Sequence, residues 1–210
     1  LGAHGFARTR AWTVAMIADL ADGSTRVVLT LATDETTRAL WPHDATLTLT
    51  VTVGRTLTID LAIANRDPAP LTCEAALHTY FTVGDIRQTT IEGLAGAAYI
   101  DKVGDVTRRV EAAAPIAFTG ETDRVYLATE ATTTIVDSLL HRRIAVAKQG
   151  SRSTVVWNPW IAKAAKMVDF GDHEWPDLVC VETANVADDR LTIAPGATAS
   201  MSVELAVRAD

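Results

Sequence analysis

The sequence predicts an all-β fold, a sandwich or a barrel, because most of it reads as short strands separated by turn residues. Residues 47–53 alternate apolar side chains with threonine, and residues 57–61 repeat the same period of two. This alternation is typical of strands with one buried and one solvated face. Turn pairs such as Asp22-Gly23 and Pro195-Gly196 recur between them, and many short strands with frequent turns favour a sandwich or a barrel.

The predicted elements follow one another along the chain. Strands are expected at residues 12–20, 26–32, 47–53, 57–61, 71–83, 125–130, 133–136, 144–147, 154–157, 178–182 and 199–207. Gly54-Arg55 predicts a type II′ hairpin, because glycine suits its first central position. Short helices are expected at residues 34–41, with Asp34 as N-cap, and at 161–168. Since no linker, repeat or low-complexity tract interrupts the chain, residues 1–210 are expected to form one domain.

Composition limits the function classes. Hydrophobic residues make up 48% and charged residues 21%, as in globular proteins, and no apolar run reaches the ~18 residues of a membrane span. The net charge of -7 argues against a nucleic-acid partner, although one local arginine can still bind a small anion. Cys73 and Cys180 lie in apolar runs without metal-binding spacing, so we expect buried thiols, no metal and a cytoplasmic location.

The strand predicted around His78 places this histidine away from the more apolar face. Alternate residues of a strand share a face, so His78 lies with Glu74 and Tyr80 rather than with Leu77 and Phe81. Histidine can donate or accept a proton near neutral pH. Because a lone strand histidine is more often structural than catalytic, the pattern alone makes His78 only a candidate.

Glu182 follows four apolar residues at the end of a strand that is expected to be buried. A carboxylate is costly to bury unless it is paired or functional, and burial raises its pKa and can make it a useful base. The other interpretation is that the buried part ends before Glu182, which is then simply solvated. Trp157 and Trp160 flank an Asn-Pro turn; they are either core residues or a platform for a sugar ring.

Six segments in a fixed order resemble the glucose-6-phosphate 1-epimerases, the hexose-6-phosphate mutarotase branch of the aldose 1-epimerase superfamily. The resemblance spans nearly the whole chain, and the order of the segments makes it specific. They are residues 4–8 (HGFAR), 78–86 (HTYFTVGDI), 93–102 (GLAGAAYIDK), 121–126 (ETDRVY), 157–160 (WNPW) and 179–182 (VCVE).

The resemblance implies a large twisted antiparallel β-sandwich, the galactose mutarotase-like supersandwich, with the sugar in an open cleft. By position in these motifs, His78 matches the catalytic histidine, Glu182 the catalytic glutamate, Arg8 a substrate-binding arginine and Asp123 an aspartate that contacts the sugar. His4 shares a motif with Arg8 but receives no role. The implied reaction interconverts the α and β anomers of a hexose 6-phosphate, above all glucose 6-phosphate, by acid/base ring opening and closure. It needs no metal, nucleotide or redox cofactor, and we expect a monomer.

The chain also departs from the family pattern. Members usually carry further strands before the HGFAR segment, including one with a substrate-binding arginine, and a glutamine is often found where this chain has Ala3. We therefore expect the domain to be incomplete at its N-terminus. Other functions stay open: a non-catalytic sugar-phosphate binding module, a mutarotase for unphosphorylated aldoses, against which Arg8 argues, and a polysaccharide-cleaving enzyme, against which the lack of a carboxylate clearly paired with Glu182 argues.

Overall fold

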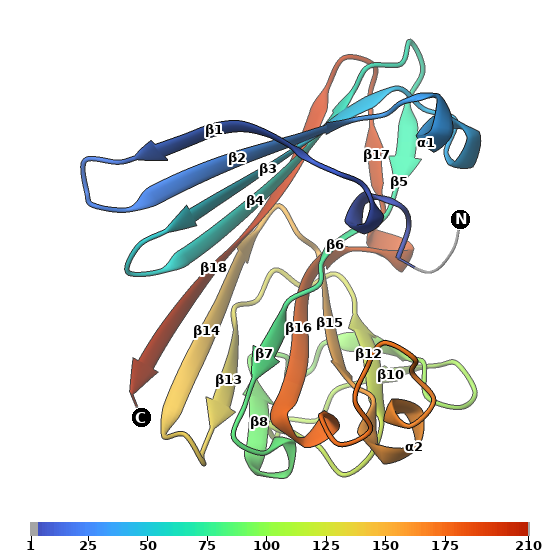
Figure 1. Cartoon of the computed structure of the whole chain (residues 1–210). Helices are drawn as coiled ribbons and strands as arrows, with labels where there is room; N and C mark the ends of the chain where they lie inside the picture. The colour runs from blue at the N-terminus through green and yellow to red at the C-terminus, as the bar shows by residue number, and fades with distance from the viewer. Residues whose placement is uncertain (1–3, 210) are drawn as a thin grey trace.

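The computed structural model describes residues 4–209, and strands are the main regular elements in this range (Figure 1). The larger sheet, in spatial order, contains β1 (Thr13–Asp19), β2 (Thr25–Ala32), β3 (Ala45–Val53), β4 (Leu57–Asn65), β18 (Thr198–Ala209), β14 (Arg142–Gln149), β13 (Thr133–Asp137), β8 (Thr89–Glu92) and β11 (Ile116–Ala117). The smaller contains β10 (Thr107–Val110), β9 (Ala98–Asp101), β12 (Thr122–Tyr126), β15 (Ser153–Asn158), β16 (Leu178–Asn185) and β6 (Ala75–Leu77), with β7 (Tyr80–Thr82) also paired to β16.

The remaining elements are short. β5 (Leu71–Cys73) and β17 (Leu191–Ile193) form a separate pair. The helical segments are η1 (Ala7–Thr9), α1 (Glu35–Leu40), η2 (Ile86–Gln88), α2 (Trp160–Ala164), η3 (Trp175–Asp177) and η4 (Ala187–Asp189). Asp34 caps α1 as predicted, since its side chain accepts from the Thr37 backbone. Within residues 4–209, no helix is both long enough and apolar enough to cross a membrane.

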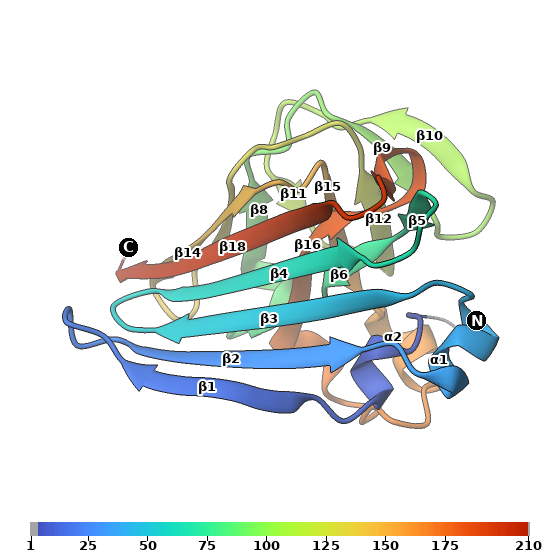
Figure 2. The same cartoon turned by 90° about the horizontal axis from the view of Figure 1, so that it is seen from above.

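The two sheets face each other across the main hydrophobic core, which confirms the predicted antiparallel sandwich. From the smaller sheet, Val156 on β15 and Val179 and Val181 on β16 point into this core. From the larger sheet, Ile135 on β13 and Ile144 on β14 meet them there. Figure 2 shows the larger sheet in the foreground and the smaller sheet behind it. Because side chains alternate along a strand, every second side chain of β15 and β16 points away from this core, onto the outer face of the smaller sheet.

A second cluster holds the N-terminal segment against the larger sheet. Leu47 and Ile63 form part of its buried centre, and Phe6 and Trp12 pack against it. The Trp12 indole N–H donates to the Ala7 carbonyl oxygen at 3.0 Å, which ties β1 back to η1. Both aromatic side chains are partly buried, and each stabilises the fold by less than the ~1.5–3 kcal/mol of full burial. The segment that carries the HGFAR motif is therefore anchored beside the smaller sheet (Figure 1).

Several local predictions need correction. Val53 pairs with Leu57, so three residues make the β3–β4 connection, and Gly54 does not adopt the positive φ of a type II′ turn. The second helix is shorter than predicted and ends at Ala164, and the strand expected at 125–130 runs instead from 122 to 126. Strands β8 to β11 were not predicted, because runs of two to four residues are too short to show a period.

The strand predicted at residues 71–83 is divided into β5, β6 and β7. β5 pairs with β17, whereas β6 pairs with β16 in the smaller sheet. Glu74 lies at this change of partner, where its carboxylate accepts a hydrogen bond from the Ala187 backbone at 2.7 Å. A second interruption falls at residues 78–79, which separate β6 from β7. His78 therefore sits in a gap of the ladder rather than inside a continuous strand.

A fully buried carboxylate fixes the chain that follows β7. The side chain of Asp137, at the end of β13, accepts hydrogen bonds from the backbone amides of Gly84 and Leu140 and from the Arg142 guanidinium. A buried charge is tolerated when it is paired and hydrogen-bonded in this way. The contacts link the β13–β14 turn of the larger sheet to the smaller sheet and so hold β7 in place.

Lys148 on β14 is a buried cation without a carboxylate in direct contact among the described residues. Its ammonium donates to the Ser153 carbonyl at 2.8 Å and to the Ser151 hydroxyl at 3.3 Å. Burial lowers its pKa to about 8. Since the ammonium is still largely charged at pH 7, the fold bears the cost of a desolvated charge there.

We predict that Lys148→Met is more stable than the wild type at pH 7, by about 1–2 kcal/mol. Methionine keeps the apolar stem, and the Ser151 hydroxyl still bonds the Ala184 carbonyl at 2.7 Å. The difference in the free energy of unfolding should shrink as pH rises from about 8 towards 10.5, the ordinary pKa of lysine. In that range the folded wild type holds Lys148 as the neutral amine. Urea unfolding at pH 7 and pH 9.5 measures this, with exposed Lys166→Met as control; a variant clearly less stable at pH 7 would contradict it.

Candidate active site

His78 and Glu182 face one another across adjacent strands of the smaller sheet. Tyr80 pairs with Cys180 and Leu77 with Thr183, so this register sets His78 opposite Glu182. The ladder is open at His78, and its imidazole Nε2 lies 3.3 Å from a Glu182 carboxylate oxygen. Two residues about a hundred positions apart in the sequence are thus brought into contact by the pairing of short strands with β16.

Glu182 is buried on the outer face of the sheet, opposite the main core. Val155 is its ladder partner on β15, and Val155 belongs with Trp157 and Cys180 to an apolar cluster on this face. Only 7% of the Glu182 side chain is exposed. Burial, reinforced by the negative charge of Asp123, raises its pKa from 4.5 to about 7, although Lys102 opposes the change. Glu182 is therefore not the solvated residue of the alternative interpretation.

His78 is half-buried among aromatic rings. Its imidazole stacks on Tyr80 with ring centroids 4.9 Å apart and meets the edges of His4 at 5.3 Å and Trp157 at 6.4 Å. Burial and the neighbouring His4 lower the pKa of His78 below its ordinary 6.5. The face assignment made from the sequence is confirmed, because Phe81 and Leu77 pack on the main core while His78 lies with Tyr80.

The two shifts reverse the usual order of the two pKa values, so that the pKa of Glu182 lies above that of His78. The pKa of Glu182 rises to about 7, and that of His78 falls from 6.5. Groups in such contact titrate as a pair, so at pH values between the two pKa values they share about one proton. A pair of this kind can take a proton from one substrate oxygen and give a proton to another without any change in its own total charge.

Asp123 and Arg8 lie around this pair. Asp123 on β12 pairs with Trp157, which pairs with Cys180, so its side chain shares the outer face with Glu182. The Lys163 ammonium lies 3.7 Å from the Asp123 carboxylate. Arg8 is exposed on η1, and its positive charge contributes to the lowered pKa of His78. The structure thus gathers all four predicted site residues on one side of the smaller sheet.

The structure places the two tryptophans of the WNPW segment differently. Trp157 belongs to the outer-face cluster, whereas Trp160 packs on Trp175 at 4.5 Å beside the main core, as the core interpretation predicts. Ala3 lies outside the described residues. Sequence reasoning gave no role to His4 and did not single out Lys102 or Lys163; lysines are common on surfaces, and only the fold brings these two near the carboxylates. Residues 4–209 contain no cluster of ligands that could hold a metal ion.

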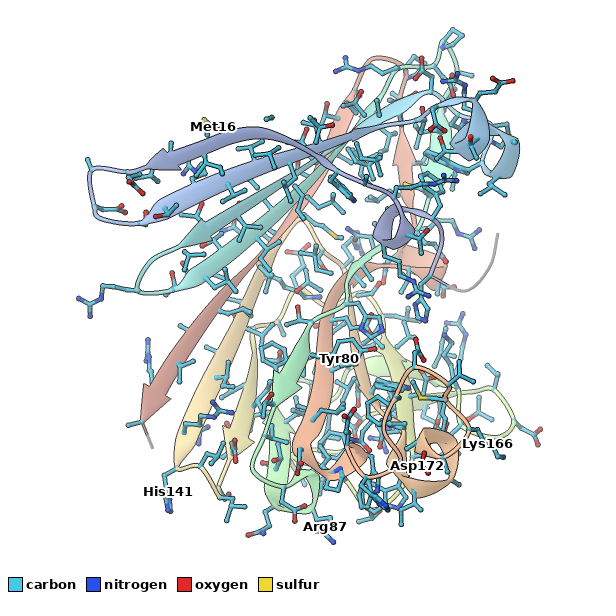
Figure 3. All side chains as sticks on the ribbon, viewed as in Figure 1. Met16, Tyr80, Arg87, His141, Lys166 and Asp172 are labelled. Atoms are coloured by element: carbon cyan, nitrogen blue, oxygen red, sulfur yellow. The ribbon has the colours of Figure 1, made fainter. Side chains whose placement is uncertain are left out.

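A pocket of about 430 Å³ adjoins the pair at Tyr80. Tyr80 and Leu178 line it from the smaller sheet, and the loop after α2 contributes Phe170 and Asp169. Figure 3 shows Tyr80 on the smaller sheet, above the loop that carries Asp172 in this view. Glu174 and Asp177 add two more carboxylates to the lining. The pocket therefore favours hydroxyl groups and disfavours phosphate, which fits better on the side of Arg8.

Comparison with known proteins gives a consistent picture. The aldose 1-epimerase family model matches residues 1–206. A protein from Escherichia coli K12, provisionally named glucose-6-phosphate 1-epimerase, is 39% identical over 211 residues, which cover 99% of this chain and 69% of the relative. A protein of the same provisional name from Cenchrus ciliaris is 35% identical and is covered to 61%. The chain thus spans about two thirds of the length of these relatives.

Solved structures agree with the sequence comparison. A Salmonella typhimurium protein, provisionally described as a mutarotase, superposes with a TM-score of 0.91 at 33% identity, over 100% of this chain and 69% of that protein. A Synechocystis protein superposes with a TM-score of 0.81 at 20% identity, which supports the fold alone. The family match, the relatives and the shared fold together show that this chain belongs to the aldose 1-epimerase family.

Proposed function

We propose that this chain interconverts the α and β anomers of a hexose 6-phosphate, with glucose 6-phosphate as the preferred substrate. The 3.3 Å contact between His78 and the buried carboxylate of Glu182 carries this proposal. The provisional names of the Escherichia coli and Cenchrus ciliaris relatives support the choice of substrate. A sugar-phosphate binding module without catalysis would not need a buried carboxylate whose pKa is raised to about 7, so an isomerase is the better interpretation.

Anomer exchange requires two proton transfers: the C1 hydroxyl loses a proton, and the ring oxygen gains one. Glu182, ionised, takes the proton of the C1 hydroxyl, and His78, protonated, gives a proton to the ring oxygen as the C1–O5 bond breaks. Rotation about C1–C2 then turns the other face of the aldehyde towards O5, and the same steps run in reverse. The two oxygens are bonded to the same carbon, which suits an acid and a base whose atoms lie 3.3 Å apart. Each positioned transfer contributes about 10²–10⁴-fold.

The charges around the pair favour one orientation of the substrate. The Arg8 guanidinium can hold a phosphate with parallel charge-assisted hydrogen bonds. Asp123 can accept from a ring hydroxyl. The pocket beyond Tyr80 is lined by Asp169, Glu174 and Asp177 and repels a phosphate. We therefore place the phosphate towards η1 and the uncharged hydroxyls towards β12 and this pocket.

Replacing Glu182 by glutamine should separate catalysis from folding. Glu182→Gln removes the base while keeping its size, and we expect the anomerisation rate to fall at least about 10²-fold. Since the raised pKa of Glu182 means that wild-type stability is lost as pH rises from 4.5 through about 7, the variant should unfold no earlier than the wild type at pH 8. NMR exchange rates on glucose 6-phosphate and thermal unfolding measure both effects. Near wild-type turnover in Glu182→Gln would rule out the mechanism.

The pH dependence of kcat/KM should follow the ionisation of Glu182 and His78. Below both pKa values Glu182 is protonated and cannot accept a proton; above both, His78 has no proton to give. We therefore expect a bell for kcat/KM, with an alkaline limb near the Glu182 pKa of about 7 and an acidic limb from the lowered pKa of His78. In His78→Asn the alkaline limb should vanish together with most of the activity. An unchanged alkaline limb in that variant would assign it to another group.

Arg8 should discriminate phosphorylated from free sugar. The protein is net negative, but long-range repulsion is screened beyond ~8 Å at physiological salt, so local cations decide binding. Hydrogen bonds to charged groups are worth about 1.5–3 kcal/mol, and we expect Arg8→Ala to raise KM for glucose 6-phosphate by about tenfold or more. KM for free glucose should change far less. Arg55→Ala, in the distant β3–β4 turn, is the matched control, and an equal loss for both sugars would refute a phosphate-specific role.

A further inference from the structure

His78 lacks the hydrogen bond that ordinarily orients a histidine at a reaction centre. Such a histidine usually donates from its second ring nitrogen to a carboxylate or a backbone carbonyl, which fixes the tautomer and the ring angle. In His78, Nε2 faces Glu182, whereas Nδ1 is buried and makes no hydrogen bond to another residue within residues 4–209. Another contact must therefore hold the imidazole at the angle that directs Nε2 towards Glu182.

Aromatic packing supplies this contact. Tyr80 lies almost parallel to His78, with 13° between the ring planes and 4.9 Å between the centroids. His4 and Trp157 meet the imidazole edge-on, at 68° and 72°. Side chains two residues apart on a regular strand are roughly 6.6 Å apart along the chain, and the gap between β6 and β7 lets these two rings approach more closely. Tyr80 is thus the ring that covers a flat face of His78.

We propose that Tyr80 is a positioning residue for His78, holding Nε2 towards Glu182 and stabilising the protonated imidazole through its ring face. The proposal rests on the proposed function in taking His78 as the acid. The face of an aromatic ring carries negative potential and attracts a cation above it. Tyr80 is 54% exposed, so packing in a core does not account for its place on this surface.

The other charges around His78 come from three elements and are independent of Tyr80. Burial, His4 and Arg8 lower the pKa of His78, whereas a hydrogen bond with its own backbone and the charge of Asp123 raise it. The stacked ring of Tyr80 acts in the same direction as Asp123. The facing groups are Glu182 from β16, Asp123 from β12, and His4 and Arg8 from the N-terminal segment. Because all of them remain when Tyr80 is replaced, a change in the titration of His78 can be assigned to the ring.

NMR titration of His78 in the intact chain tests this directly. In Tyr80→Phe the ring face is kept, and His78 should titrate as in the wild type. In Tyr80→Leu the face is lost, and the pKa of His78 should fall by about half to one pH unit. Val106→Ala, at an exposed position, is the surface control. An unchanged His78 titration in Tyr80→Leu would overturn the proposal, as would a fall in Tyr80→Phe equal to that in Tyr80→Leu.

Kinetics give the second readout. In Tyr80→Leu, kcat for glucose 6-phosphate at pH 7 should fall about three- to tenfold, because the protonated imidazole becomes rarer. The acidic limb of kcat/KM should move to lower pH, which a purely structural defect would not cause. If the leucine variant does not fold, Tyr80→Met repeats the test. Absence of anomer exchange in the wild type would refute the proposed function, whereas the titration would still decide the role of Tyr80.

Discussion

The contact between a buried carboxylate and a half-buried imidazole is the constraint on which the rest of this site depends. Glu182 loses most of its hydration on the outer face of β16, and its pKa rises to about 7 as a result. A carboxylate in that environment is costly to ionise, so the fold gives up stability near neutral pH to keep it there. His78, 3.3 Å away, is the group with which it can exchange that proton. Buried groups with perturbed pKa values cluster at functional sites for this reason.

The contact between His78 and Glu182 is possible because the two faces of the smaller sheet differ: one packs in the core, and the other carries the site. On β16, Val179 and Val181 pack into the core between the sheets, while Cys180 and Glu182 alternate with them on the other face. That outer face has its own apolar cluster around Val155 and Trp157, which excludes water from Glu182. The break between β6 and β7 frees His78 from the ladder, and the Asp137 contacts hold β7 in place. A strongly anchored scaffold thus carries a small, locally irregular site.

Much of the fold could be predicted because it rests on local patterns. The alternation in β3 and β4 identified long half-buried strands, and the sequence around Asp34 identified a capped helix. The side-chain face of His78 followed from parity alone. The short strands β8 to β11 carry too few residues for a period to emerge. Residues 71–83 are divided between two sheets at Glu74, where the distant Ala187 backbone donates a hydrogen bond to its carboxylate, and no local pattern reveals either feature.

The site was predictable in its residue types but not in its electrostatics. Motif order pointed to His78, Glu182, Arg8 and Asp123, and the fold gathers them on one side of the smaller sheet. The stacking of Tyr80 on His78, the edge contact of His4 and the approach of Lys102 and Lys163 arise from tertiary packing. For Trp160 the sequence left a core position and a sugar platform open, and its ring packs on Trp175 beside the core.

The central claim is that Glu182 and His78 share about one proton at pH values between their two pKa values. Infrared difference spectra between the wild type and Glu182→Gln, on protein labelled with ¹³C-glutamate, isolate the carboxyl stretch of this one residue. The account predicts a protonated carboxyl band that persists above pH 6 and is lost with a midpoint near 7, the raised pKa of Glu182. A band lost with a midpoint near the ordinary 4.5 would show that Glu182 is solvated and fully ionised at neutral pH, and would contradict the account.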